Sequence, residues 1–210
     1  FMYSWIHPFV YYTLVYNYGL SDTVTTEFML DFVVQFFITL IAVALVVGWY
    51  RRTPLTEMGF NRLSLRNLAV YGMGWGILIF MAVMLIGAII QNFVSVPPQD
   101  FENVLKDAGQ NWETIVLIVI GAVLGPFYEE IFFRGIIYPV CRVHLGVWGG
   151  IAISAAIFSL VHMDIVRFLP LFVGGVGLAY IYEKSGSIYA AWAAHGTWNL
   201  IMAMSLFVKT

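Results

Sequence analysis

Long runs of apolar residues, separated by short polar stretches, dominate the pattern along this chain. A helix needs roughly 20 mainly apolar residues to cross the hydrocarbon core of a bilayer. Runs that meet or approach this length lie at about 31–50, 68–92, 113–143, 147–163, 166–183 and 187–208. A shorter, aromatic-rich run from Trp5 to Leu20 suits a membrane interface as well as a crossing, and we expect a seventh span there. The pattern predicts an all-α polytopic membrane protein with about seven transmembrane helices in one compact bundle.

The composition agrees with a bilayer environment. Of the 210 residues, 61% are hydrophobic and only 10% are charged, whereas soluble domains carry about 25% charged residues. The net charge of −2 provides no basic field for nucleic acid, so we expect the lipid bilayer and no nucleic acid as a partner. The single cysteine, Cys141, excludes an intrachain disulfide and a cysteine-cluster metal site.

The lysines and arginines between the spans predict the orientation of the chain, because basic loops stay in the cytoplasm. One side collects Arg51, Arg52, Arg62, Arg66, Arg142 and Lys184. The other collects Lys106, Arg167 and Lys209 together with Asp22, Glu27, Asp100, Glu102, Asp107, Glu113 and Asp164. We therefore expect the first side to be cytoplasmic, and a bacterial cytoplasmic membrane as the location.

The connections between the spans predict one domain. The loop from Arg51 to Leu68 reads as a short amphipathic connector at the cytoplasmic surface, and the loop from Ser95 to Asn111, with its prolines and acidic residues, as solvated. No internal repeat interrupts residues 1–210, so we expect a single transmembrane domain. No basic segment or small-residue cleavage signal precedes Asp22, and we expect no cleaved signal peptide.

Three ionisable residues interrupt one of the apolar spans. Glu129, Glu130 and Arg134 would each cost several kcal/mol if they faced lipid, so they must face protein or a wet cavity. Glu130 and Arg134 are four residues apart and can form an ion pair on one helix face. Glu129 lies about 100° around the helix and has no local partner. Gly125-Pro126, one turn earlier, predicts a kink that either lines a cavity or only serves packing.

Two later helices each contribute a histidine. Phe158 and His162 are four apart near the end of one helix, and His195 and Asn199 are four apart on a helix rich in alanine. Small residues allow close helix approach, and the side chains of His195 and Asn199 can direct donors to a common point. A rough depth count places Glu129, His162 and His195 in the membrane interior, so they can share one site.

Together, the run Glu129-Glu130-x-x-x-Arg134, the pair Phe158-x-x-x-His162 and the pair His195-x-x-x-Asn199 resemble the CPBP family of intramembrane endopeptidases. This family (CAAX protease and bacteriocin-processing) is also called Abi. The resemblance covers about residues 112–205, which we expect to be the catalytic core, while the N-terminal half matches only as generic membrane helices.

The resemblance implies a function for these positions. Glu129 and His162 would activate a water molecule for attack on a peptide carbonyl, and His195 and Asn199 would stabilise the oxyanion. Glu130, Arg134 and Phe158 would organise the site. The expected substrate is a peptide or protein, which can be membrane-associated. Such carboxylate and histidine pairs can perform general-base catalysis, and donors in a dry site can stabilise a tetrahedral intermediate.

Three alternatives remain open from the sequence. Glu129, His162 and His195 could instead be zinc ligands, although the chain has no His-Glu-x-x-His helix and we favour a mechanism without metal or other cofactor. The chain could be a non-catalytic immunity or scaffold protein that retains the motifs. A proton-coupled transporter is disfavoured because the sequence has no inverted repeats.

Overall fold

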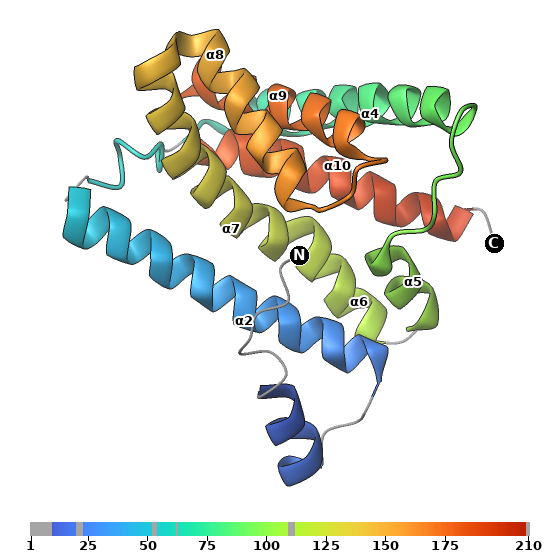
Figure 1. Cartoon of the computed structure of the whole chain (residues 1–210). Coiled ribbons are helices and arrows are strands. Elements are labelled where there is room, and N and C mark those ends of the chain that lie inside the picture. Colours follow the sequence, from blue (N-terminus) through green and yellow to red (C-terminus); the bar gives the residue numbers. More distant parts are fainter. Residues whose placement is uncertain (1–9, 20–22, 52–53, 62, 109–111, 209–210) are drawn as a thin grey trace.

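The computed structural model describes residues 10–208 except 20–22, 52–53, 62 and 109–111. Within these residues every regular element is a helix, which confirms the predicted all-α class (Figure 1). The first half contains the π-helical segment η1 (Thr13–Asn17), then α2 (Val24–Ala44) running into π-helical η2 (Leu45–Arg51), and then α3 (Leu65–Asn67), π-helical η3 (Leu68–Gly74) and α4 (Trp75–Gln91) in one continuous stretch.

The second half begins with a short helix, α5 (Asp100–Asp107). A long helical stretch follows, made of α6 (Trp112–Val119), η4 (Ile120–Leu124), α7 (Gly125–Phe132), η5 (Phe133–Ile137) and α8 (Tyr138–Val161), in which η4 and η5 are π-helical. The chain ends with α9 (Phe168–Ser185) and α10 (Ile188–Val208). The motifs predicted from the sequence therefore lie on α7, η5, α8 and α10.

Three helical stretches in the described part of the chain are long and apolar enough to cross a membrane: Val24–Gly48, Leu65–Gln91 and Trp112–Val161. The last two helices, α9 and α10, are less apolar. Helix α10 packs against η3, α4, η4, α7 and α9, and three of its alanines are completely buried (Ala190, Ala191 and Ala194). Because neighbouring helices surround it, α10 can carry polar residues that lipid would not tolerate.

Part of the expected first span lies outside the described residues. Residues 1–9 and 20 are not described, and η1 lies within the remaining stretch, where the side chains of Tyr12 and Tyr16 are exposed.

The chain changes direction inside α8, at Gly146. This residue has φ 71° and ψ −178°, a conformation that glycine adopts without steric cost. This kink lies between the expected spans 113–143 and 147–163.

Arg142, one of the basic residues that the sequence assigned to the cytoplasmic side, links two helices at one end of the bundle. Arg142 on α8 donates two hydrogen bonds of 2.9 Å to the carboxylate of Glu183 on α9, and the Tyr138 hydroxyl donates another of 2.7 Å. Burial alone would raise the pKa of Glu183, but these hydrogen bonds outweigh it and lower the pKa. The ionised carboxylate therefore links α8 to α9 at this end.

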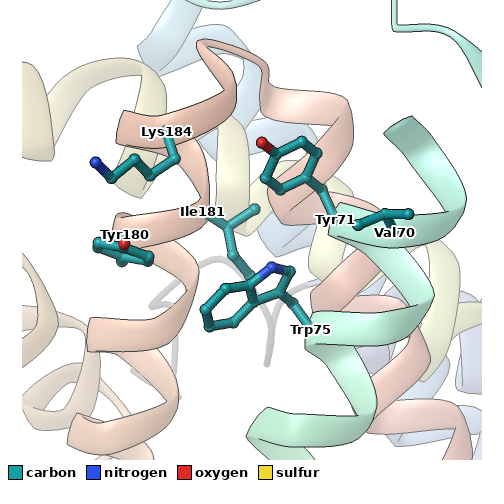
Figure 2. Close-up of a pocket in the computed structure, with 6 residues that line it drawn as sticks. All are labelled: Val70, Tyr71, Trp75, Tyr180, Ile181 and Lys184. Atoms are coloured by element: carbon teal, nitrogen blue, oxygen red, sulfur yellow. The ribbon is translucent and has the colours of Figure 1, made fainter. Parts of the chain in front are cut away.

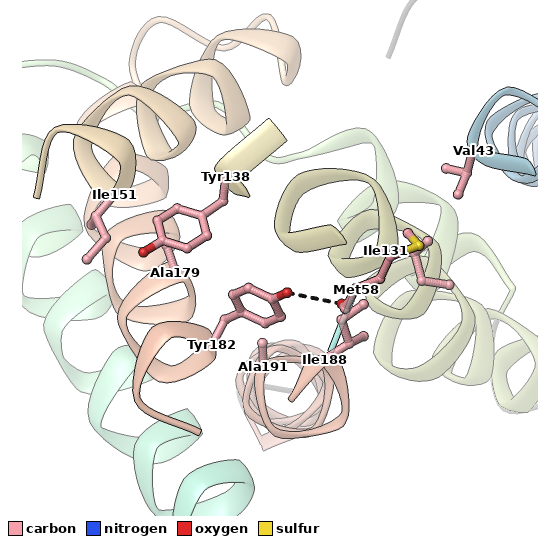
Figure 3. Close-up of a cluster of buried hydrophobic side chains, with 9 residues drawn as sticks. All are labelled: Val43, Met58, Ile131, Tyr138, Ile151, Ala179, Tyr182, Ile188 and Ala191. Carbon is pink, nitrogen blue, oxygen red and sulfur yellow. Dashed lines mark hydrogen bonds between the residues drawn. The ribbon is translucent and has the colours of Figure 1, made fainter. Parts of the chain in front are cut away.

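The connector before α3 packs against the same end of the bundle. The Tyr182 hydroxyl of α9 donates to the carbonyl oxygen of Met58 at 3.0 Å, and Met58 is buried among apolar residues of α7, α9 and α10 (Figure 3). The backbone N–H of Ile188, at the start of α10, donates to the carbonyl oxygen of Gly59 at 2.8 Å. Hydrogen bonds therefore hold the connector against the end of α9 and the start of α10.

The expectation that the loop from Ser95 to Asn111 is solvated is wrong for its centre. Helix α5 forms there, and its Val104 and Leu105 are buried against α6 and α10. The acidic residues that suggested solvation occupy the other face of an amphipathic helix, where Glu102 pairs with Lys106 at 2.7 Å. Charge content alone did not reveal the apolar face.

The weakened helix before the carboxylates is the π-helical segment η4, directly before Pro126. Proline has no N–H to donate, so carbonyl groups of the preceding turn need other partners. Helix α10 provides two of them: Asn199 Nδ2 donates to the Gly121 carbonyl at 2.9 Å and Trp192 Nε1 to the Val123 carbonyl at 2.8 Å. Between these contacts, Gly196 lies directly against the Ala122 carbonyl.

We predict that Gly196→Ala destabilises the protein, because a Cβ at this position would lie 2.4 Å from the Ala122 carbonyl oxygen. Overpacking of this kind costs about 1–3 kcal/mol. Gly87→Ala on α4 is the matched control, since no neighbouring atom lies within 4 Å of its added Cβ. The measurement is the apparent Tm in one detergent. Equal Tm values for the two variants would contradict the close approach of α10 to η4.

Candidate active site

A completely buried ion pair lies at the centre of the site. Arg134 Nη1 donates to Oε1 of Glu130 at 2.8 Å, and both side chains have no exposed surface. The other terminal nitrogen, Nη2, donates to the Gly175 carbonyl of α9 at 3.0 Å. The spacing of four residues predicted this pair. In the structure, Arg134 also connects η5 to α9 through the hydrogen bond to Gly175.

The same carboxylate oxygen holds His195. Its Nδ1 lies 2.8 Å from Oε1 of Glu130, and the histidine is only 3% exposed. An ionised carboxylate can only accept, so Nδ1 carries the proton and the ring orientation is set. From the sequence, His195 was expected to act on the oxyanion and Glu130 to pair with Arg134. That Glu130 binds both Arg134 and His195 was not predicted.

Glu129 points to the other ring nitrogen of the same histidine. Its Oε2 lies 4.0 Å from Nε2 of His195, and its side chain is 13% exposed. Glu129 forms no hydrogen bond to any other residue that the structure describes. The two adjacent carboxylates therefore differ as the helical spacing predicted. Glu130 is buried and accepts hydrogen bonds, while Glu129 is partly exposed. A water molecule can bridge a separation of this size.

His162 lies just after the end of α8, where its Nδ1 is 2.7 Å from the Phe158 carbonyl oxygen. A carbonyl can only accept, so Nδ1 donates in this contact. The Phe158 ring is buried between the two histidines, with centroids 4.7 Å from His162 and 5.8 Å from His195. The Arg134 guanidinium lies 5.1 Å from the centre of the same ring.

The structure also places residues that the motifs did not include. Trp198 stacks on the His195 ring with centroids 5.4 Å apart, and Gly174 of α9 leaves room for the Trp198 ring. Trp198 follows His195 by three residues, so neighbouring positions on one helix face are the sequence signal that could have indicated this contact. Trp198 and Glu130 together restrict the histidine ring.

Asn199 lies one turn beyond His195 on α10, as predicted, but it contacts the backbone of η4. The hydrogen bond to the Gly121 carbonyl uses one of its two amide N–H groups. The second N–H is left for another acceptor. The structure therefore associates Asn199 with the loosened backbone segment before the carboxylates, and its predicted contact with an oxyanion depends on this second donor.

The proposed zinc ligands do not form a metal centre. Within the described residues, no three side chains of His, Cys, Asp or Glu are arranged to hold a metal ion. Nδ1 of His195 contacts Glu130 and Nδ1 of His162 contacts the Phe158 carbonyl, contacts that metal-binding histidines also make. The spacing of the three side chains, and not these contacts, is therefore the observation that bears on zinc.

Comparison with known proteins covers this same region. Residues 111–201 match the family model described as Type II CAAX prenyl endopeptidase Rce1-like. Over 89 residues the chain is 28% identical to the "Putative membrane peptidase YdiL" of Bacillus subtilis (strain 168). This alignment covers 42% of the present chain and 36% of that protein, so the chain spans little more than a third of its relative. No solved structure matches the chain.

The matched segment contains all three motifs and the buried contacts that join α7, η5, α8 and α10. Both comparisons refer to membrane peptidases of the kind that the motifs suggested. The region that carries the motifs is therefore similar to CAAX prenyl endopeptidases and to a membrane peptidase, which confirms the resemblance predicted from the sequence.

Proposed function

We propose that this protein is an intramembrane endopeptidase that hydrolyses peptide bonds with a water molecule activated by Glu129 and His162. One observation carries the proposal. The accessible carboxylate of Glu129 faces Nε2 of His195 at 4.0 Å, and the His195 ring is held by the buried Glu130. Two adjacent carboxylates with different environments provide one chemical group and one supporting group.

In the proposed reaction, each of the four candidate catalytic side chains has its own task. Glu129 takes a proton from water, assisted by His162, and the resulting hydroxide attacks the peptide carbonyl. The carbonyl oxygen becomes negative and accepts hydrogen bonds from protonated His195 and from the free amide N–H of Asn199. The intermediate then collapses as the leaving nitrogen receives the proton. Glu130 binds Nδ1 of His195 and so directs Nε2 toward Glu129 and the reacting carbonyl.

The substrate class follows from the family and from the location of the site. The matched family is described as prenyl endopeptidases, and both carboxylates of the site lie on the stretch Trp112–Val161, which is long and apolar enough to span a membrane. A membrane-associated peptide or protein is therefore the proposed substrate, and the bacterial cytoplasmic membrane is the proposed location. A non-catalytic immunity or scaffold protein is the second candidate. It would retain the packing contacts of the site and have no peptidase activity.

We predict that Glu129→Ala, His162→Ala and His195→Ala each lower kcat for peptide cleavage by at least about a hundredfold, because general bases and oxyanion donors typically contribute factors of this size. Cleavage of a peptide library by detergent-purified protein is the measurement. His144→Ala is the matched control, since that histidine is exposed on α8 away from the site, and it should cleave like the parent. Full activity in all three site variants would refute the proposal and favour a non-catalytic protein.

Metal dependence is a separate prediction. Because the three candidate ligands do not form a metal site, we expect purified active protein to contain much less than one zinc ion per chain and to keep its activity after chelation. Elemental analysis and cleavage assays before and after chelation check this. Stoichiometric zinc together with activity that chelation removes and added zinc restores would establish the metal-dependent alternative.

The role of the buried ion pair generates a further prediction. Arg134→Gln leaves the charge of Glu130 buried without its cation, which should cost about 3–5 kcal/mol of stability. The apparent Tm should fall clearly. Arg142→Gln is the matched control: its partner Glu183 is partly exposed, so the loss should be much smaller.

A double variant separates stability from catalysis at this position. Glu130→Gln combined with Arg134→Gln removes both buried charges and should recover part of the lost Tm. Activity should stay low, because the carboxylate that orients the His195 ring is lost. If Arg134→Gln alone leaves the apparent Tm unchanged, the pair has no structural role. If the double variant regains full activity, Glu130 does not control His195.

A further inference from the structure

A second pocket lies between η3–α4 and α9, separate from the candidate active site. Val70, Tyr71 and Trp75 form one wall, and Tyr180, Ile181 and Lys184 form the other (Figure 2). The cavity has a volume of about 270 Å³. In Figure 2 the Lys184 side chain extends away from Tyr71 and over Tyr180, while the ring of Trp75 projects from the other wall toward Tyr180. The pocket thus contains both polar and apolar side chains.

The charge of this pocket is positive. Lys184 is its only ionisable residue with a charge at neutral pH, and its ammonium group lies 5.6 Å from the centre of the Tyr180 ring. Neighbouring Glu183 does not neutralise it through a salt bridge, because both carboxylate oxygens are bound by Arg142. Within the described part of the chain, Lys184 has no salt bridge or hydrogen bond. A negatively charged group fits the pocket beside Lys184.

Polar donors are also available on the wall opposite the lysine. Among the described residues, neither the Tyr71 hydroxyl nor the Trp75 indole N–H has a hydrogen-bond partner. A phosphate group accepts several hydrogen bonds and prefers a cation beside it. Trp75 packs against Tyr180 at 5.7 Å, and Trp148 of α8 stacks on the other side at 6.1 Å. Aromatic side chains with polar edges are typical of the membrane interface.

An apolar track leads away from the pocket along the same helical stretch. Val70, Met73 and Ile77 recur at a spacing that places them on neighbouring positions, and all three are exposed. In a membrane protein such a surface contacts acyl chains. Lys184 is close to the turn at Gly186, at the end of the bundle where Arg142 lies and where the sequence predicts the cytoplasmic surface. A lipid headgroup and its acyl chain can therefore occupy pocket and track together.

From these observations we propose that the pocket formed by Tyr71, Trp75, Tyr180 and Lys184 binds an anionic phospholipid, with the phosphate at Lys184 and an acyl chain along Val70, Met73 and Ile77. The free glycerol phosphate group would bind weakly by itself, because it lacks the apolar contacts. This site does not depend on peptidase activity, so lipid binding can be tested even if the proposed function is wrong.

The test is native mass spectrometry of the detergent-purified protein with phosphatidylglycerol and with phosphatidylcholine of identical acyl chains. The parent should bind phosphatidylglycerol more tightly. Lys184→Gln should weaken that binding about fivefold, since one basic residue near an anionic lipid contributes about 1 kcal/mol. Lys184→Arg should retain it, and phosphatidylcholine binding should not change in either variant.

Lys106→Gln on α5 is the matched control, because Lys106 is an exposed lysine outside the pocket. It should bind phosphatidylglycerol like the parent. Equal affinity of the parent for the two lipids, or equal loss in Lys184→Gln and Lys106→Gln, would overturn the proposal. So would binding of glycerol phosphate as tight as that of the lipid, which would identify a soluble phosphate ligand. Because Lys184 is exposed, an unchanged apparent Tm verifies that its variants are folded.

Discussion

The carboxylate of Glu130 is the interaction on which the rest of the site depends. One of its oxygens accepts from Arg134 and from His195, each at 2.8 Å, in an interior from which solvent is excluded. A buried charge is tolerated only when its partners are in place. Glu130 therefore requires η5, α10 and, through the bond from Arg134 to Gly175, α9 to assemble around α7. The same contacts that stabilise the bundle orient the histidine next to Glu129.

The loosened backbone before the carboxylates imposes a second constraint on α10. Pro126 deprives the preceding π-helical segment of a donor, and side chains of Trp192 and Asn199 donate to its carbonyl groups instead. Gly196 lies between them because a side chain would collide with the backbone. A helix that must offer small residues and donors on one face cannot be uniformly apolar. This explains why α10 carries alanine, glycine and polar residues among its apolar ones.

Much of the fold was accessible to sequence reasoning, because each membrane span must contain enough apolar residues. The long apolar runs, the break at Gly146 and the ion pair between Glu130 and Arg134 are local properties of length and spacing. Helix α5 was missed because its buried face is only a few residues wide and its charged face suggested a solvated loop. The candidate catalytic residues could be proposed from the motifs, but their separate roles stay predictions.

The sequence by itself determined the all-helical class and the family resemblance. It also determined that the two adjacent carboxylates point in different directions from one helix. These depend on periodicity and on the high cost of charge in lipid. Only the tertiary structure decided that Glu130 holds His195, that Phe158 lies between the two histidines, and that Asn199 contacts η4. Such contacts join residues up to 78 positions apart, and they arise from the packing of helices whose mutual rotation no local pattern records.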